Sequence, residues 1–457
     1  MLMVILWPTK ISAAWQQLGI IFLAPKTDYL CLETNMTDKP VLSKCYEDCV
    51  TYEYQTEFGN TIISQWELIC DRAWMANFTQ TVAMFGVLLG SIFFGFVADR
   101  YGRRPALLTA CMLQLFTTMT EVFCPTYWSF TAVRFFLGTS TAGTLLCPFI
   151  FIVEITGPNK RELIACLGAI PLAIGEMVMP IFAYFLRKYD MFCLGVAVPN
   201  LIYIVYFFMM PESPKWLISM GRLEEASAVM KQAARWNNLP SDNMMDVAKS
   251  IAIDNDNKDD STRKANYLDL FKTKTLRINT LCSCTIWFVI GITFYGSNQY
   301  IGQTSSSVFI SIFLAGAMQI PGIIVAAFLC KYVGRRITII TFFSICAISN
   351  ATLAVPDDWF YIKLVAGTIA VGCASGAFSS IYMYTTELFP TVTRNMAMGA
   401  SSTVSRLGSM IAPFIAGLNV VAPWLPPSAF AIVPLIAAFA CYLLPETRGK
   451  KLPDHLA

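Results

Sequence analysis

The chain has 457 residues, 56% of them hydrophobic and 14% charged, with a mean hydropathy of +0.55 and a formal net charge of +3. Soluble domains carry about 25% charged residues, so this composition excludes an ordinary soluble protein, and the small net charge argues against a nucleic-acid partner. The single histidine, His455, nearly excludes His-based catalysis and a multi-His metal site, and no cofactor is expected.

Apolar runs of about 20 residues, the length that a helix needs to cross a bilayer, recur along the chain. The first begins almost at Met1, contains Lys10 and lacks the charged start and cleavage site of a secretory signal, so we expect a shortened N-terminus. The pattern predicts an all-α, multi-pass membrane protein with twelve transmembrane helices. The runs are 3–24, 78–98, 105–124, 127–153, 163–186, 191–211, 277–300, 306–330, 337–355, 359–384, 397–420 and 426–444.

Positively charged residues gather in alternate connections between these runs. "DRYGRR" (99–104), "GPNKR" (157–161), "KYVGRR" (331–336) and "ETRGKK" (446–451) all fall on one side of the predicted membrane. Because Lys and Arg are enriched in cytoplasmic loops, this side and both termini are predicted to be cytoplasmic.

The segment 25–76 is then a polar extracellular loop. Its four cysteines, Cys31, Cys45, Cys49 and Cys70, predict two disulfides with the pairing left open; four free thiols are the alternative. The sequon at Asn35 predicts a glycan.

Landmarks in the first half of the chain recur about 233 residues later. The sequence 102–104 returns as 334–336, Glu154 as Glu387, and 211–213 as 445–447. This indicates two homologous six-helix bundles, 1–211 and 277–445, joined by a cytoplasmic linker with short helices (212–276) and followed by a cytoplasmic tail (446–457). Parallel six-helix halves around a midplane site are the architecture of the major facilitator superfamily.

Two ionisable residues interrupt otherwise apolar runs, Glu176 in the fifth and Arg406 in the eleventh. An ionisable residue in a span costs about 2.5–3.5 kcal/mol on insertion scales, so it normally faces the bundle interior and has a partner or a function. The repeat makes the two helices equivalent, and we expect them to face each other across the central axis. One interpretation is a dipolar pocket, with Arg406 for a substrate carboxylate and Glu176 for a cationic head; the alternative is a salt bridge that locks one conformation.

Four motifs give the chain a resemblance to solute carrier family 22, the organic ion transporters: "DRYGRRP", "PESPKWLISMGRLEEA", "TTELFPTVTRNMAMG" and "LPETRGKKLPD". The segments 182–191 and 394–414 look most like the carnitine and zwitterion branch, whereas Glu176 and 294–302 depart from the vertebrate pattern, as in an invertebrate member. Family cation transporters carry an aspartate where this chain has Arg406; anion and carnitine members carry an arginine. The resemblance implies a plasma-membrane transporter of carnitine-like or β-alanine-like zwitterions by alternating access, with organic anion exchange, organic cation transport and sugar transport as alternatives.

The resemblance also implies residues that line the pocket or work the gate. Pocket candidates besides Arg406 and Glu176 are Trp287 and Phe294 on helix seven, and Phe378, Ser379 and Tyr382 on helix ten. Aromatic faces suit a quaternary ammonium, although stripes at helical spacing also serve as packing. Charged motif residues are expected to pair across helix ends and hold the inner gate shut: Asp99, Arg103, Arg104, Glu154, Arg161, Arg335, Arg336, Glu387 and Arg394. Arg134, inside helix four, is expected to order its own bundle.

No nucleophile–base pair, metal-ligand cluster or Walker motif is found in the sequence, so an enzyme is not expected. A sugar porter shares "RYGRR" and "PESP" but needs neither the cysteine-bearing loop nor Arg406. A receptor without transport activity is the third possibility. Coupling to Na⁺, to H⁺ or to an exchanged ion is left open.

Overall fold

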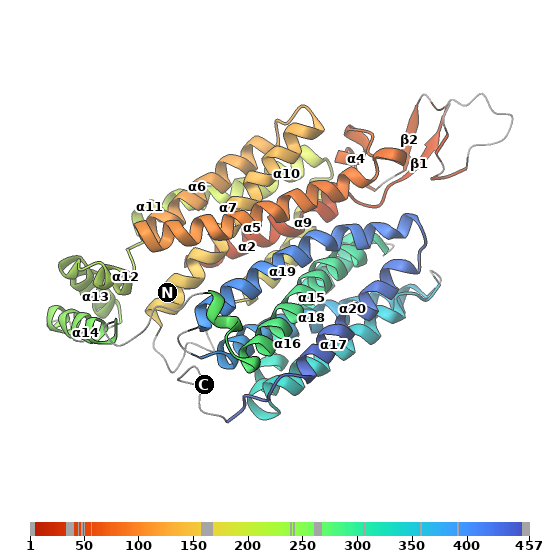
Figure 1. The fold of residues 1–457 in the computed structure, drawn as a ribbon. Coiled ribbons are helices and arrows are strands. Elements are labelled where there is room, and N and C mark those ends of the chain that lie inside the picture. Colours follow the sequence, from red (N-terminus) through yellow and green to blue (C-terminus); the bar gives the residue numbers. More distant parts are fainter. Residues whose placement is uncertain are drawn as a thin grey trace.

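The computed structural model describes residues 5–32, 41–43, 45–46, 49, 51–55, 57–156, 168–237, 240, 243–259, 267–304, 307–356, 359–390 and 393–449. Its long helices form two bundles, one from each half of the chain (Figure 1). A small sheet lies at one end of the molecule, which we call the loop end, and the short helices between the bundles lie at the other, which we call the linker end.

Within the described residues, each of the twelve predicted runs coincides with one long helix or with consecutive short ones, which confirms the all-α fold class. The first bundle contains α2 (Trp7–Leu18), α3 (Ile20–Leu23), α5 (Trp74–Tyr101), α6 (Arg103–Glu121), α7 (Tyr127–Ile155), α9 (Ile170–Phe185), α10 (Tyr189–Ala197), the 3₁₀ turn η3 (Val198–Ile202) and α11 (Tyr203–Met209). The second contains α15 (Lys274–Thr304), α16 (Val308–Tyr332), α17 (Arg335–Thr352), α18 (Phe360–Leu388), α19 (Arg394–Gly417), η5 (Leu418–Val420) and α20 (Leu425–Tyr442).

Seven of the described helical segments are long and apolar enough to cross a membrane by length and composition alone. Helix α9, with 16 residues, is shorter. Helix α6 is more polar because its inward face carries Gln114, Thr117, Thr118 and Glu121, all of which are buried inside the first bundle.

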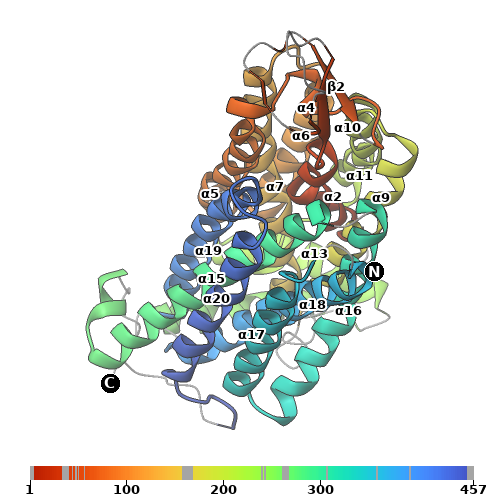
Figure 2. The same ribbon diagram turned by 90° about the vertical axis from the view of Figure 1, so that its right-hand side faces the viewer.

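The two bundles meet through two equivalent pairs of helices. Helix α9 packs on α16, and α19 packs on α5. Figure 2 shows these two contacts at opposite sides of the interface. The two helices that the repeat makes equivalent, α9 and α19, therefore each pack against a different helix of the opposite bundle.

The loop end is built from a two-stranded antiparallel sheet and two disulfides. Strand β1 (Asp28–Cys31) pairs with β2 (Tyr52–Gln55), and the short helix α4 (Ile62–Gln65) and the turn η1 (Cys70–Arg72) follow. Disulfides join Cys31 to Cys49 and Cys45 to Cys70, which gives the predicted pair of bridges and supplies the pairing that the sequence left open. Asn35 lies outside the described residues.

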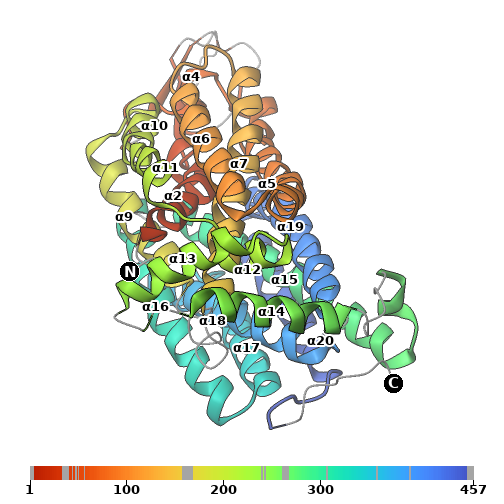
Figure 3. The same ribbon diagram turned by 90° about the vertical axis from the view of Figure 1, so that its left-hand side faces the viewer.

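The linker end carries a small helical layer of its own. Helices α12 (Pro214–Ser219), α13 (Leu223–Trp236) and α14 (Met244–Asp259) lie across the ends of the bundles (Figure 3), and the turn η4 (Tyr267–Phe271) leads into α15. Trp216, Leu217, Ile218, Ala226 and Ala248 form a separate apolar cluster that holds these three helices together.

Candidate functional site

Arg406 lies near the middle of α19 and is partly buried. Its Nη1 donates a hydrogen bond to the hydroxyl of Tyr295 on α15 at 3.0 Å, and that hydroxyl donates to Oε1 of Gln17 on α2 at 2.7 Å. The second of these bonds crosses between the bundles. In the described part of the chain, no carboxylate lies within ion-pair distance of Arg406.

Glu176 lies on α9 and is 1% exposed. Its Oε2 accepts a hydrogen bond from Nε2 of Gln319 on α16 at 2.5 Å, while its Oε1 is buried without a hydrogen-bond partner. Gln319 also accepts from Ser375 on α18. Glu176 thus joins the two bundles through an amide, and no Glu176–Arg406 ion pair exists in this conformation.

Four predicted aromatic residues converge from α15 and α18. The rings of Trp287 and Tyr382 are 4.6 Å apart, and Phe378 lies 5.9 Å from Trp287 and 5.8 Å from Phe294. Trp287 is fully buried and donates to the Thr385 hydroxyl, whereas Phe294, Phe378 and Tyr382 keep partial exposure. Ser379 follows Phe378 on α18 and is also half-buried.

One residue that sequence reasoning missed reaches this aromatic cluster from the first bundle. Phe149 on α7 lies 6.5 Å from Tyr382, and Lys10 Nζ lies 5.8 Å from the Phe149 ring. Lys10 is 7% exposed and donates to the Gly168 carbonyl, with no carboxylate partner among the described residues. The signal that could have identified Lys10 is a charged residue inside an apolar run. Gln17 and Gln319, which are polar residues inside apolar runs, give the same kind of signal.

The charged motifs pair within each bundle. Arg103 contacts Glu154 at 2.8 Å and Asp99 at 2.9 Å in the first, and Arg335 contacts Glu387 at 2.8 Å in the second. Arg104 and Arg336 donate to backbone carbonyls of their own bundles. Arg394 keeps two buried nitrogens without a partner, and Arg161 lies outside the described residues. The expected pairing thus ties helices of one bundle together, and no ion pair between described residues joins the two bundles in this conformation.

Two glycines form the turns that precede α6 and α17 in these charged motifs. Gly102 and Gly334 adopt φ angles of +113° and +125°, which only glycine adopts readily. Each opens a helix whose first N–H groups donate to a carboxylate from the end of the same bundle, Glu212 for α6 and Glu446 for α17. A carboxylate at a helix N-terminus satisfies unpaired donors and interacts favourably with the helix dipole.

The bundles touch each other closely at the loop end. Phe309 of α16 lies 5.9 Å from Phe22 and 5.3 Å from Phe58 of the first half. The Thr81 hydroxyl donates to the Met410 carbonyl at 2.9 Å between α5 and α19. This conformation is therefore closed at the loop end.

We expect the change Arg103→Ala to lower the maximal transport rate several-fold and to leave the apparent affinity nearly unchanged. The side chain is 12% exposed and lies at a helix junction away from Arg406, so its loss leaves Glu154 without its cationic partner, held by the Ser213 hydroxyl alone, and does not alter the central site. The measurement is the concentration dependence of uptake, normalised to surface protein. Arg222→Ala, which breaks an exposed pair with Glu225, is the matched control and should change neither parameter. A large loss of affinity at an unchanged rate would instead place Arg103 in the binding site.

Comparisons with known proteins agree with this architecture. Residues 41–454 match the family model "Sugar (and other) transporter". The chain is 32% identical over 407 residues to the human organic cation/carnitine transporter 2, covering 88% of this chain and 72% of that protein. It is 31% identical over 421 residues to mouse solute carrier family 22 member 21, covering 90% and 73%.

The fold also matches that of a solved transporter. The inward-open structure of the xylose transporter XylE from E. coli superposes with a TM-score of 0.72 at 15% identity, covering 98% of this chain and 97% of that chain. At this identity the likeness shows the fold alone. Taken with the sequence relatives, it establishes that the chain belongs to solute carrier family 22, within the major facilitator superfamily of membrane transporters.

Proposed function

We propose that this protein transports small organic zwitterions by alternating access and binds the substrate carboxylate at Arg406. The observation that carries the proposal is that Arg406 is partly exposed beside the junction of the bundles and has no carboxylate partner among the described residues. The planar guanidinium can hold a carboxylate through two parallel hydrogen bonds. The relative named organic cation/carnitine transporter 2 is consistent with a carnitine-like substrate.

The cationic end of the substrate is proposed to rest on the aromatic cluster. The partly exposed rings of Phe294, Phe378 and Tyr382 offer π-surface to an ammonium group. Trp287 packs edge-to-face against Tyr382. Ser379, on the same helix, is proposed to add a hydroxyl to the wall. Glu176 is proposed to reach the substrate only when α9 and α16 separate, because its Oε2 is held by Gln319 in this conformation.

The loop end is proposed to face the outside of the plasma membrane, and both termini the cytoplasm. The two disulfides support this orientation, since disulfides form in oxidising surroundings. The distribution of arginines supports this orientation too, because Lys and Arg are enriched on the cytoplasmic side of membrane proteins. The arginines that follow Gly102 and Gly334 lie at the linker end: Arg103, Arg104, Arg335 and Arg336.

Organic anion transport is the second candidate, and Lys10 is the observation that favours it. This buried ammonium lies on the first-bundle side of the aromatic cluster, so the site has a cation on each side. A substrate with two anionic groups would satisfy both, whereas a zwitterion would satisfy only Arg406.

Uptake by oocytes that express the full chain tests the proposal. We expect labelled carnitine or β-alanine to be taken up and the methyl ester of the same compound to be excluded, because the ester lacks the charge that Arg406 binds. The panel includes tetraethylammonium, a dicarboxylate and glucose. Preference for the dicarboxylate would support the second candidate, and equal uptake of acid and ester or uptake of glucose would contradict both.

A further inference from the structure

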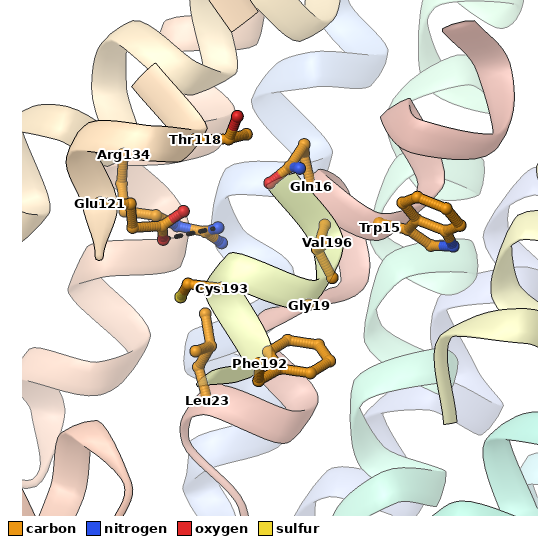
Figure 4. A pocket seen from close by; sticks show the side chains of 10 residues that line it. All are labelled: Trp15, Gln16, Gly19, Leu23, Thr118, Glu121, Arg134, Phe192, Cys193 and Val196. Atoms are coloured by element: carbon orange, nitrogen blue, oxygen red, sulfur yellow. Dashed lines mark hydrogen bonds and ion pairs between the residues drawn. The ribbon is translucent and has the colours of Figure 1, made fainter. Parts of the chain in front are cut away.

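A small cavity inside the first bundle holds a buried ion pair that the proposed substrate site does not use. It lies between α2, α6, α7 and α10, and Glu121 and Arg134 face each other across it beside Cys193 (Figure 4). Glu121 is 3% exposed and Arg134 is 1% exposed. The cavity has room for roughly one water molecule.

The ion pair is loosely joined and surrounded by unsatisfied groups. Arg134 Nη1 lies 3.4 Å from Glu121 Oε1, beyond the range of about 2.7–2.9 Å of a tight charge-assisted bond. Arg134 Nε and Gln16 Nε2 are buried without hydrogen-bond partners, and both residues line the cavity. A second small cavity, also lined by Gln16 and Arg134, reaches Gln17 and Thr141. The guanidinium therefore borders a water-sized cavity on each of two sides.

Two sets of hydrogen bonds that meet at Gln17, one at its backbone carbonyl and one at its side chain, link this pair to Arg406. Arg134 donates to Gln80 Oε1 at 3.3 Å, and Gln80 donates to the Gln17 carbonyl at 2.7 Å. The Gln17 side chain accepts from Tyr295, which accepts from Arg406. The state of Glu121 is thereby connected to the substrate site through the bond that crosses the bundles.

Few other titratable groups face Glu121. Helix α7 contributes Arg134, and α10 contributes Cys193 with Tyr189 and Asp190 close to it. The segment after α6 contributes Cys124. Helices α2 and α5 present the amides of Gln16 and Gln80. The tyrosines of α11 lie near Cys111, ten residues earlier on α6.

We propose that Glu121 is a proton-binding site that couples transport to a proton gradient, a proposal that rests on the organic-ion transport proposed above. One proton from water binds one carboxylate oxygen and gives a neutral carboxylic acid, and release reverses the step. The neutral acid no longer attracts Arg134, so the guanidinium shifts toward Gln80 and the second cavity. A buried charge that loses its partner is strongly disfavoured, which supplies the driving force for the shift. A bound sodium ion is disfavoured here because Arg134 would repel it and the cavity is too small for its oxygen ligands.

Transport of labelled carnitine into proteoliposomes at a clamped membrane potential tests the proposal. With the lumen at pH 7.5 and the outside at pH 6.5, we expect gradient-driven accumulation that a protonophore abolishes, with a ceiling of about tenfold for one coupled proton. Glu121→Gln should lose this accumulation but retain carnitine exchange at equal pH, and Glu121→Asp should keep part of it. Asp190→Asn, a carboxyl-to-amide change on the neighbouring helix α10, is the matched control and should keep all of it.

The outcomes separate this inference from the proposed function. If the unmodified protein exchanges carnitine but the gradient drives no accumulation, or if Glu121→Gln accumulates as well as the unmodified protein, the proton site is wrong and organic-ion transport stands. If no substrate of the panel is exchanged, both proposals fail. If Glu121→Gln does not reach the membrane, Gln80→Leu is the deciding variant, because it removes the hydrogen bond between Arg134 and Gln80. It should abolish accumulation while carnitine exchange continues. Unchanged accumulation in Gln80→Leu would overturn the inference.

Discussion

The change Arg406→Ala is expected to abolish uptake of zwitterions and anions at normal surface expression. Each hydrogen bond to a charged group is worth about 1.5–3 kcal/mol, so loss of two raises the apparent KM by at least about a hundredfold. Arg406→Lys keeps the charge but loses the second hydrogen bond, so it should retain partial uptake. Arg406→Asp should shift preference toward cations, because it removes the attraction for a carboxylate and adds repulsion.

The measurement is uptake of a zwitterion and of its methyl ester by these three variants, normalised to surface protein. Tyr295→Phe is the matched control, since it removes only the hydroxyl that Arg406 contacts and leaves the guanidinium in place. It should reduce uptake far less than Arg406→Ala. If Arg406→Ala still discriminates acid from ester, the carboxylate binds elsewhere.

The change Gly408→Ala is expected to lower both surface expression and uptake strongly, although it adds a single methyl group. A Cβ at this position would lie 2.2 Å from the Phe288 carbonyl oxygen and 3.3 Å from the Ile292 backbone nitrogen. Small residues such as Gly408 let the backbones of α15 and α19 lie close together. Such close packing stabilises helix association in membranes. Pushing the two helices apart also moves Arg406, two residues away, from Tyr295.

Gly399→Ala on the same helix is the matched control. The nearest atom to a Cβ there is the Tyr267 hydroxyl at 3.9 Å, so the methyl group makes an ordinary van der Waals contact and no clash. Because alanine favours a helix over glycine by about 1 kcal/mol, this variant should be neutral or slightly stabilising. The measurements are surface labelling of cells that express each variant and thermal inactivation of each variant in detergent. Equal surface labelling and equal thermal stability of the two variants would contradict the packing argument.

The sequence predicted the fold well because its signals are local or repeated. Apolar length gives the spans, and the recurrence of 102–104 at 334–336 gives the two halves. The same recurrence could not predict which helices meet: equivalence relates α9 to α19, whereas contact depends on how the bundles dock. Gln319, the partner of Glu176, was missed for this reason, because that contact crosses between the bundles. Tyr295, the partner of Arg406, lies in the same bundle and was missed because the repeat does not show which side chains of α15 face α19. The disulfide pairing was equally out of reach, since spacing alone allows more than one connectivity.

The contact between the bundles at the loop end is made of phenylalanine rings, a neutral hydrogen bond and the Arg187 guanidinium, which lies 6.0 Å from the Phe309 ring, while the described ion pairs stay inside the bundles. Apolar contacts weaken on cooling, and neutral ones are indifferent to screening by salt. The equilibrium between the conformation that is closed at the loop end and the one that is open there should therefore depend strongly on temperature and little on ionic strength. Cooling should therefore weaken the closure at the loop end and shift the resting conformation, whereas added salt should leave it nearly unchanged.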